Sequence, residues 1–119
     1  MAVIAYPGNL ASAQVGTGDS TNTIQRNGGE VAGRQMVLRV TTNAGTTITF
    51  TIKGSVDGTT FYNIPYSVGS AVGGDYVTTA ITTTTAKTEL YFLMFGQPWN
   101  FIKTNVSANT GMTPTTDLL

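Results

Sequence analysis

The chain has 119 residues, with six Lys or Arg against six Asp or Glu and neither His nor Cys. This length fits one domain with a single hydrophobic core, because domains usually contain about 100–200 residues. The absence of His and Cys excludes imidazole bases, Ser-His-Asp and Cys-His catalytic groups, thiolate metal sites and disulfides. The basic residues are scattered along the sequence, so no nucleic-acid partner is expected.

The apolar segments of the chain are short. Residues 2–6 end at Pro7 and lack the basic region of a signal peptide. Residues 90–95 form the longest strongly apolar run, whereas a membrane-spanning helix needs about 20 such residues. We therefore expect a protein that is made in the cytoplasm and has no membrane partner.

Residues 1–33 are expected to form an extended N-terminal arm. Gly, Asn, Asp and Ser recur at residues 16–20 and 27–29 and interrupt any long periodic segment. We expect the arm to be mobile in an isolated subunit and ordered in an assembly, where it contacts another copy or an underlying shell. Deleting residues 2–20 should then leave the melting temperature of the β domain nearly unchanged. The apolar side chains available for such contacts are Val3, Ile4, Tyr6 and Leu10.

Residues 34–111 have the pattern of an all-β domain. Thr, Gly, Asn and Ser are abundant, and these residues favour strands and turns over helices. Apolar and polar residues alternate with the period of two that half-buried strands show. The expected strands cover residues 36–41, 47–53, 60–64, 76–81, 86–95 and 99–108. Short strands at this spacing indicate a single β-sandwich or jelly roll, followed by a C-terminal tail at residues 112–119.

One hydrophobic core is expected for this domain. The segment at residues 90–95 is apolar on both of its alternating faces, so the pattern predicts a strand that is buried on both sides. The side chains expected in the core are Ile48, Phe50, Ile52, Leu90, Phe92 and Ile102.

The dipeptide Asp57-Gly58 has two interpretations. A carboxylate beside Gly occurs in calcium loops, but such loops need several oxygen ligands at defined spacing, and only one acid is present here. A turn is favoured, because Asp bonds to its own downstream backbone and Gly adopts positive φ.

The acidic residues are far apart in the sequence, so no catalytic carboxylate pair is visible, although folding can bring two of them together. They are Asp19, Glu30, Asp57, Asp75, Glu89 and Asp117. No catalytic, metal-binding or cofactor-binding residue is predicted, and no cofactor is expected.

The aromatic residues offer an alternative function. An aromatic platform can stack on a sugar or a base, but in a small sandwich these side chains more commonly form the core or a subunit interface. The residues concerned are Tyr62, Tyr66, Tyr91, Trp99 and Phe101. The hydroxyls of Thr47, Thr49 and Thr51 share one strand face, where a solvent-facing strand is favoured over an ice-binding surface.

Two segments carry a resemblance to a known group of proteins. They are residues 50–64 (FTIKGSVDGTTFYNI) and residues 99–106 (WNFIKTNV). A strand, a Ser-x-Asp-Gly-x-x-Phe turn and a later aromatic-rich strand resemble small β-sandwich virion proteins of tailed bacteriophages, including capsid decoration or cement proteins. The resemblance covers roughly residues 35–110. The same hairpin also occurs in discoidin-like carbohydrate-binding domains, which carry aromatic and cysteine landmarks that this chain lacks.

The resemblance implies a non-enzymatic subunit on the capsid surface of a virion. Its expected partners are the major capsid protein and neighbouring copies of itself, as a homotrimer. The candidate interface residues are Val3, Ile4, Tyr6, Leu10, Tyr62, Tyr66 and Trp99. The alternatives are a phage tail, neck or head-fibre component, a carbohydrate-binding module and an enzyme with a carboxylate pair.

Overall fold

The structure is a computed structural model that describes residues 2–26, 35–43, 45–69, 76–94 and 98–119. These residues form two β-sheets and contain no helix. Sheet A comprises β1 (Ala2–Ala5), β3 (Gly18–Asp19), β4 (Asn22–Gln25), β6 (Thr47–Ser55), β7 (Tyr62–Asn63), β9 (Ile81–Thr83) and β11 (Phe101–Thr110). Sheet B comprises β2 (Gly8–Ala11), β5 (Val37–Thr42), β8 (Tyr66–Val68), β10 (Lys87–Leu93) and β12 (Thr115–Leu118).

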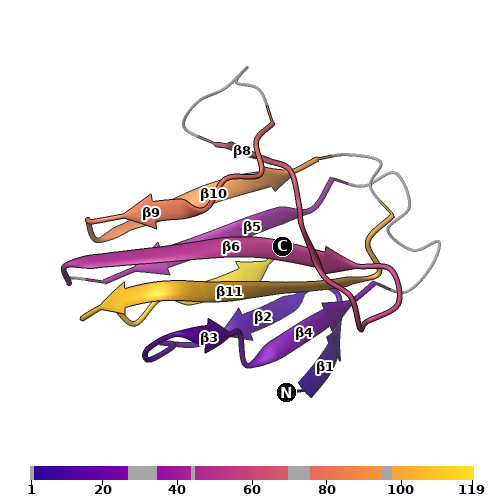
Figure 1. The fold of residues 1–119 in the computed structure, drawn as a ribbon, viewed down its shortest axis with the longest axis horizontal. Helices are drawn as coiled ribbons and strands as arrows, with labels where there is room; N and C mark the ends of the chain where they lie inside the picture. Colours follow the sequence, from indigo (N-terminus) through magenta and orange to yellow (C-terminus); the bar gives the residue numbers. More distant parts are fainter. Residues whose placement is uncertain (1, 27–34, 44, 70–75, 95–97) are drawn as a thin grey trace.

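The two sheets pack face to face as a β-sandwich, with sheet A in front in Figure 1. The strand order in sheet A is β1-β4-β11-β6-β7, with β3 beside β11 and β9 beside β6. The order in sheet B is β2-β12-β5-β10-β8. Strand β1 runs parallel to β4, and the other paired strands are antiparallel. The expected all-β sandwich is therefore confirmed.

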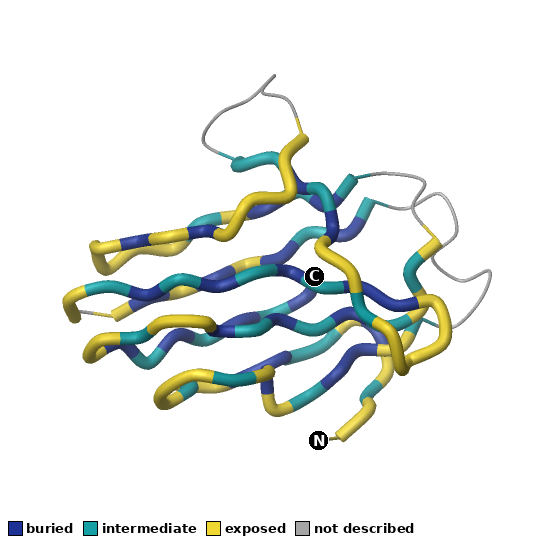
Figure 2. Tube along the Cα trace, viewed as in Figure 1, coloured by how far each residue is buried: buried dark blue, intermediate teal, exposed yellow. Residues whose placement is uncertain are grey.

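The alternation of the sequence determines which side chains form the core. Along β6, Ile48, Phe50 and Ile52 are buried, while the intervening Thr residues lie on the outer face. The same alternation buries Leu38 on β5 and Ile102 on β11. Figure 2 shows the resulting change between buried and less buried positions along each long strand. These parts of the predicted core are confirmed.

The predicted burial of β10 on both faces is wrong. Tyr91 and Leu93 point into the core, whereas Leu90 is 37% exposed and Phe92 is only partly buried. Leu90 pairs with the outward-facing Arg39, and no second layer covers this face of sheet B among the described residues. A strand that is apolar on both faces gives no periodic signal, so the sequence could not distinguish the inner face.

The expected N-terminal arm is also corrected by the structure. Residues 2–25 contribute β1 to β4 to both sheets, and Leu10 and Ile24 have no exposed surface. The chain crosses from sheet A to sheet B between β1 and β2, at the cis peptide bond before Pro7. Residues 1 and 27–33 of the expected arm lie outside the described residues.

The expected C-terminal tail is part of the sandwich as well. Strand β12 lies between β2 and β5 and buries Leu118, while Met112 is buried before the strand begins.

The segments predicted as strands at 60–64 and 76–81 contain only β7 and the first residue of β9. No helix in the described part of the chain is long and apolar enough to cross a membrane.

Candidate functional site

The turn after β6 is held by the Asp57 side chain. Asp57 Oδ1 accepts hydrogen bonds from the backbone N–H groups of Thr59 (2.8 Å) and Thr60 (3.0 Å) and from the Ser55 hydroxyl (2.9 Å). The Ser55 oxygen in turn accepts a bond from the N–H of Gly58, whose φ is +83°. The bonds from Thr59, Thr60 and Ser55 hold the pKa of the Asp57 carboxyl below its ordinary value. The predicted turn is confirmed.

Among the described residues, this turn does not gather a cluster of acidic side chains. No group of three or more acidic side chains that could hold a metal ion occurs in the part of the chain that the structure describes. Oxygen Oδ1 of Asp57 accepts the three hydrogen bonds that hold the turn, which gives this side chain a structural role.

Trp99 and Tyr62 form an aromatic pair close to this turn. The indole of Trp99 packs against Gly54 on the inner side of β6, where an added Cβ would lie 2.7 Å from the ring. The Tyr62 ring lies beside it, with 6.2 Å between the ring centroids and 32° between the planes. Tyr62 is 59% exposed, whereas Trp99 is partly buried against the core. Of the two rings in this pair, that of Tyr62 is therefore the one open to a ligand.

The other aromatic residues are not joined to this pair. Tyr66 and Tyr91 are buried and pack edge to face, and the hydroxyl of Tyr66 donates a 2.8 Å hydrogen bond to the carbonyl of Thr79. Burial, with smaller contributions from the charges of Glu89 and Tyr66, raises the pKa of Tyr91 to about 12. Phe101 lies on the outer face of sheet A, so the five aromatic residues do not make one platform.

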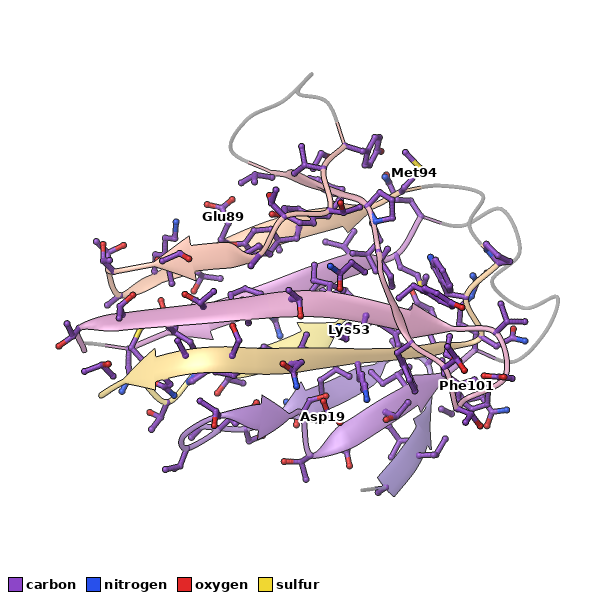
Figure 3. The ribbon with its side chains drawn as sticks, viewed as in Figure 1. Asp19, Lys53, Glu89, Met94 and Phe101 are labelled. Atoms are coloured by element: carbon purple, nitrogen blue, oxygen red, sulfur yellow. The ribbon has the colours of Figure 1, made fainter. Side chains whose placement is uncertain are left out.

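The outer face of sheet A is largely polar apart from Phe101, and its polar side chains bond to one another. Lys103 on β11 donates to Asp19 at 2.9 Å, with its ammonium 4.0 Å from the centre of the Phe61 ring. Asn105 donates to the other carboxylate oxygen of Asp19 at 2.8 Å, and Lys53 donates to the Asn63 side chain at 3.2 Å. Figure 3 shows Lys53 and Asp19 along this face. The bonds to Asp19 link β3 to β11, and the bond from Lys53 links β6 to β7.

The pKa of the Asp19 carboxyl reflects these contacts. Partial burial raises the pKa of its carboxyl, but hydrogen bonds from Lys103 and Asn105 and the charges of Lys103 and Lys53 outweigh it. The net effect lowers the pKa below its ordinary value.

Farther along the face, the hydroxyls of Thr49 and Thr82 share a hydrogen bond of 3.0 Å. Thr47, Thr49 and Thr51 thus lie on the outer side of the strand.

The described acidic residues do not form a catalytic pair. Asp19 lies on the outer face of sheet A and Asp117 on the outer face of sheet B, with the core between them. Asp57 is in its turn, and Glu89 is on β10. Glu30 and Asp75 lie outside the described residues.

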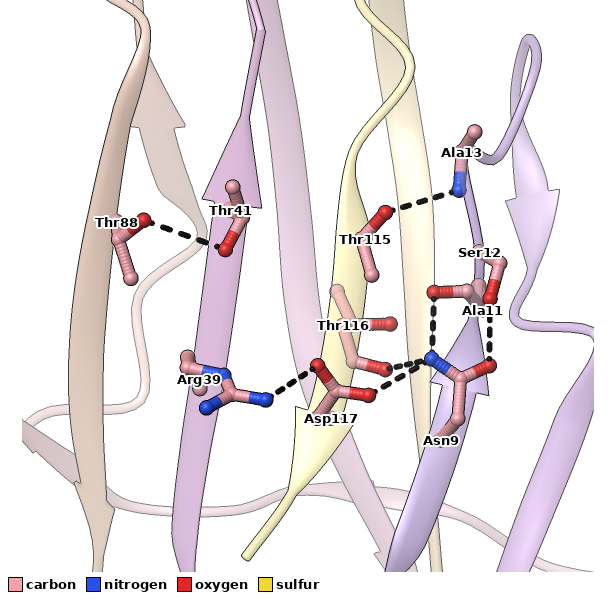
Figure 4. A network of polar contacts seen from close by, with 10 residues as sticks. All are labelled: Asn9, Ala11, Ser12, Ala13, Arg39, Thr41, Thr88, Thr115, Thr116 and Asp117. Carbon is pink, nitrogen blue, oxygen red and sulfur yellow. Dashed lines mark hydrogen bonds and ion pairs between the residues drawn. The ribbon is translucent and has the colours of Figure 1, made fainter.

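The outer face of sheet B has a polar half. Arg39 pairs with Asp117 at 3.1 Å, and Asn9 donates to the same carboxylate at 2.8 Å. The hydroxyls of Thr41 and Thr88 lie 3.3 Å apart. Figure 4 shows these contacts crossing β10, β5, β12 and β2. The polar groups in this half are tied to one another, as they are on sheet A.

The other half of this face is apolar. We call it the sheet B patch and define it as Val37, Leu90, Phe92 and Leu119. Phe92 is the cross-strand partner of Val37, and the Leu119 N–H donates to the Val37 carbonyl at 2.8 Å, which continues the β12–β5 register. Leu90 is 37% and Leu119 is 39% exposed, while Val37 and Phe92 are partly buried. An apolar patch on an outer face is a candidate contact surface, in contrast to apolar side chains that are exposed singly.

The structure places the candidate interface residues in different environments. Leu10 and Tyr66 belong to the core, and Tyr6 is buried with its hydroxyl donating to the Leu119 carbonyl. Ile4 and Trp99 pack partly against the core, whereas Val3 and Tyr62 are 56% and 59% exposed. A direct interface role remains a prediction for each of them, and Val3 and Tyr62 are the most accessible.

Comparisons of the chain with protein-family models, curated proteins and solved structures found no match.

Proposed function

We propose that the protein is a non-enzymatic structural subunit of a bacteriophage virion, of the capsid decoration or cement type. The observation that carries the proposal is the sheet B patch. It places four apolar side chains on the outer surface of a sheet, where they add little to the core of their own subunit. Such a surface is suited to a protein partner, because contact removes the apolar groups from water.

The surroundings of the patch favour docking rather than chemistry. Arg39 and Asp117 neutralise each other at its border, and the whole chain has a net charge of zero. Many copies can then pack on one shell without long-range repulsion. A ligand that binds only the assembled shell stabilises it by mass action, which is the physical basis of cementing.

The acidic groups support a role without catalysis. Asp19 and Asp117 are held in ion pairs on opposite faces, and Asp57 supports a turn. Each of these carboxylates has a structural task, which fits the resemblance of residues 50–64 and 99–106 to virion proteins. The major capsid protein and further copies of this chain are the proposed partners, with a homotrimer on the virion surface as the expected assembly.

The test is binding to phage heads that were assembled without this protein. The Leu90→Glu variant should lose about tenfold or more in affinity, because a charge would be buried at the contact. The Thr49→Glu variant adds the same charge to the polar face of sheet A and is the matched control. Equal binding by Leu90→Glu and wild type in co-sedimentation contradicts docking through the patch. Binding to tails or necks but not to heads would assign the protein to the alternative virion position.

Carbohydrate binding is a second candidate, and the exposed ring of Tyr62 favours it. Aromatic rings stack on sugars through their apolar faces, and Tyr62 is the open member of its pair with Trp99. Tyr62→Ala is the suitable test, since Trp99 packs on Gly54 and its loss would disturb the fold. Glycan binding by wild type that disappears in Tyr62→Ala supports this candidate, and an absence of glycan binding by wild type rejects it.

A further inference from the structure

Strand β1 forms one edge of sheet A and is open on its outer side. It pairs only with β4 among the described residues, and Val3 is 56% exposed. An edge strand presents unpaired N–H and C=O groups that can pair with another chain. Most soluble proteins therefore protect their edges with charges, prolines, bulges or very short strands.

The other edges have such protection. Strands β3 and β7 have two residues each and β9 has three. Tyr66 on β8 is already bridged to Val77, and the side chain of Asn22 donates to the Asn9 carbonyl on β2 at 2.9 Å. Strand β1 has four residues, AVIA, with no charge and no proline. Its open edge is therefore the least protected one described.

The hydrogen-bonding groups of β1 are placed so that two copies can pair. The N–H group of Ala2 donates to the carbonyl of Thr21, just before β4, and that of Tyr6 donates to the carbonyl of Gln25, the last residue of β4. Because peptide groups alternate along a strand, those of Val3 and Ala5 point to the open side. In an antiparallel pair of β1 strands, Val3 of one copy lies opposite Ala5 of the other and exchanges two hydrogen bonds with it. The twofold axis passes beside Ile4, and the second Val3–Ala5 pair completes the contact.

We propose that β1 is a self-association edge at which a second copy of this chain adds its own β1 in antiparallel register, joining the two A sheets into one. An antiparallel pair of identical β1 strands is self-complementary at Val3 and Ala5, and the lack of charge in the strand allows the two identical segments to meet without repulsion. The contact is independent of the proposed docking of the sheet B patch, since it lies on the other sheet. It gives a dimer, whereas the resemblance implies a trimer.

Ile4→Cys tests the contact directly, because the chain has no cysteine of its own. Ile4 meets its counterpart in a non-hydrogen-bonded pair, where the Cα atoms lie about 4.5 Å apart. That distance falls within the range of about 4.4–6.8 Å found across disulfides. Mild oxidation should give a disulfide-linked dimer of twice the chain mass. Val15→Cys is the matched control, since Val15 is 81% exposed and lies outside the strands.

The register is tested in the Ile4→Cys background. Adding Val3→Lys should abolish the cross-link, and adding Ala5→Glu to that variant should restore it, because the introduced lysine and glutamate then lie opposite each other in the pair. Circular dichroism and thermal melts establish that each variant is folded. Equal cross-linking at positions 4 and 15, or cross-linking that survives Val3→Lys alone, overturns the proposal. A trimer in which the introduced thiols at position 4 stay free overturns it as well.

Discussion

The two outer faces of the sandwich use their side chains differently. On sheet A, the carboxylate of Asp19 accepts hydrogen bonds from Lys103 and Asn105 on the neighbouring strand. These polar groups are therefore satisfied within one subunit. On sheet B, the Arg39–Asp117 pair covers one half, and the apolar side chains of Leu90 and Phe92 are left partly open beside it. A face that satisfies its own polar groups has little to gain from a partner, whereas an open apolar face gains by burial.

The largest effect is expected from deleting residues 2–20. The deletion removes β1, β2 and β3, so β12 loses one of its two neighbours and the core loses Leu10. Loss of the Leu10 side chain alone costs about 2–5 kcal/mol, against a total stability of about 5–15 kcal/mol for a typical domain. The deleted chain should therefore be unfolded by circular dichroism. A cooperative melt near that of wild type would show that both faces can form without the N-terminal strands.

Two leucines on β10 allow the contribution of the core to stability to be compared with that of the sheet B patch. Leu93→Ala should lower the free energy of unfolding by about 2–5 kcal/mol, because Leu93 is 1% exposed in the core. Leu90→Ala, on the opposite side of the same strand, should cost less than about 1 kcal/mol. Urea unfolding of both variants measures the difference. Equal losses would mean that the sheet B patch is part of the subunit's own core.

Acid should weaken the polar face of sheet A. The pKa of Asp19 is lower in the folded protein than its ordinary value of 3.8, so its ionised form contributes stability above that pH. This contribution is lost as the pH falls through the folded pKa. Thermal melts between about pH 5 and pH 2 should show a shallower acid loss for Asp19→Asn than for wild type. Identical acid profiles would show that the ionisation of Asp19 does not contribute to the stability of this face.

The smallest effect is expected at the ion pair beside the sheet B patch. The side chain of Arg39 is 44% exposed, and exposed ion pairs contribute about 0–1 kcal/mol. Arg39→Ala should therefore leave the urea midpoint almost unchanged, and added salt should narrow any difference. A loss well above 1 kcal/mol, beyond the range of about 0–1 kcal/mol for exposed pairs, would show that the polar half supports the fold.

Local patterns in the sequence predicted part of this molecule. Alternation placed Ile48, Phe50 and Ile102 in the core, and Asp-Gly chemistry predicted the turn at Asp57. The four short strands within residues 2–25 could not be predicted, because residues distant in sequence hold them in place. Strand β12, for example, pairs with β2 from the other end of the chain.

The sheet B patch was missed for a related reason. Val37, Phe92 and Leu119 come from three separate parts of the chain, and only strand register brings them side by side. The alternation along β10 gave no sign of which face would be covered, because Leu90 and Phe92 are as apolar as Tyr91 and Leu93. A contact surface of this kind becomes visible only when the pairing is known.

The most direct test of the account is an electron cryo-microscopy reconstruction of the source particle at a resolution that distinguishes the two sheets. We expect the protein on the head, with Leu90 and Phe92 of sheet B against the major capsid protein and Lys103 and Asp19 of sheet A facing solvent. A subunit that contacts the shell through sheet A, with Leu90 and Phe92 facing solvent, would contradict it.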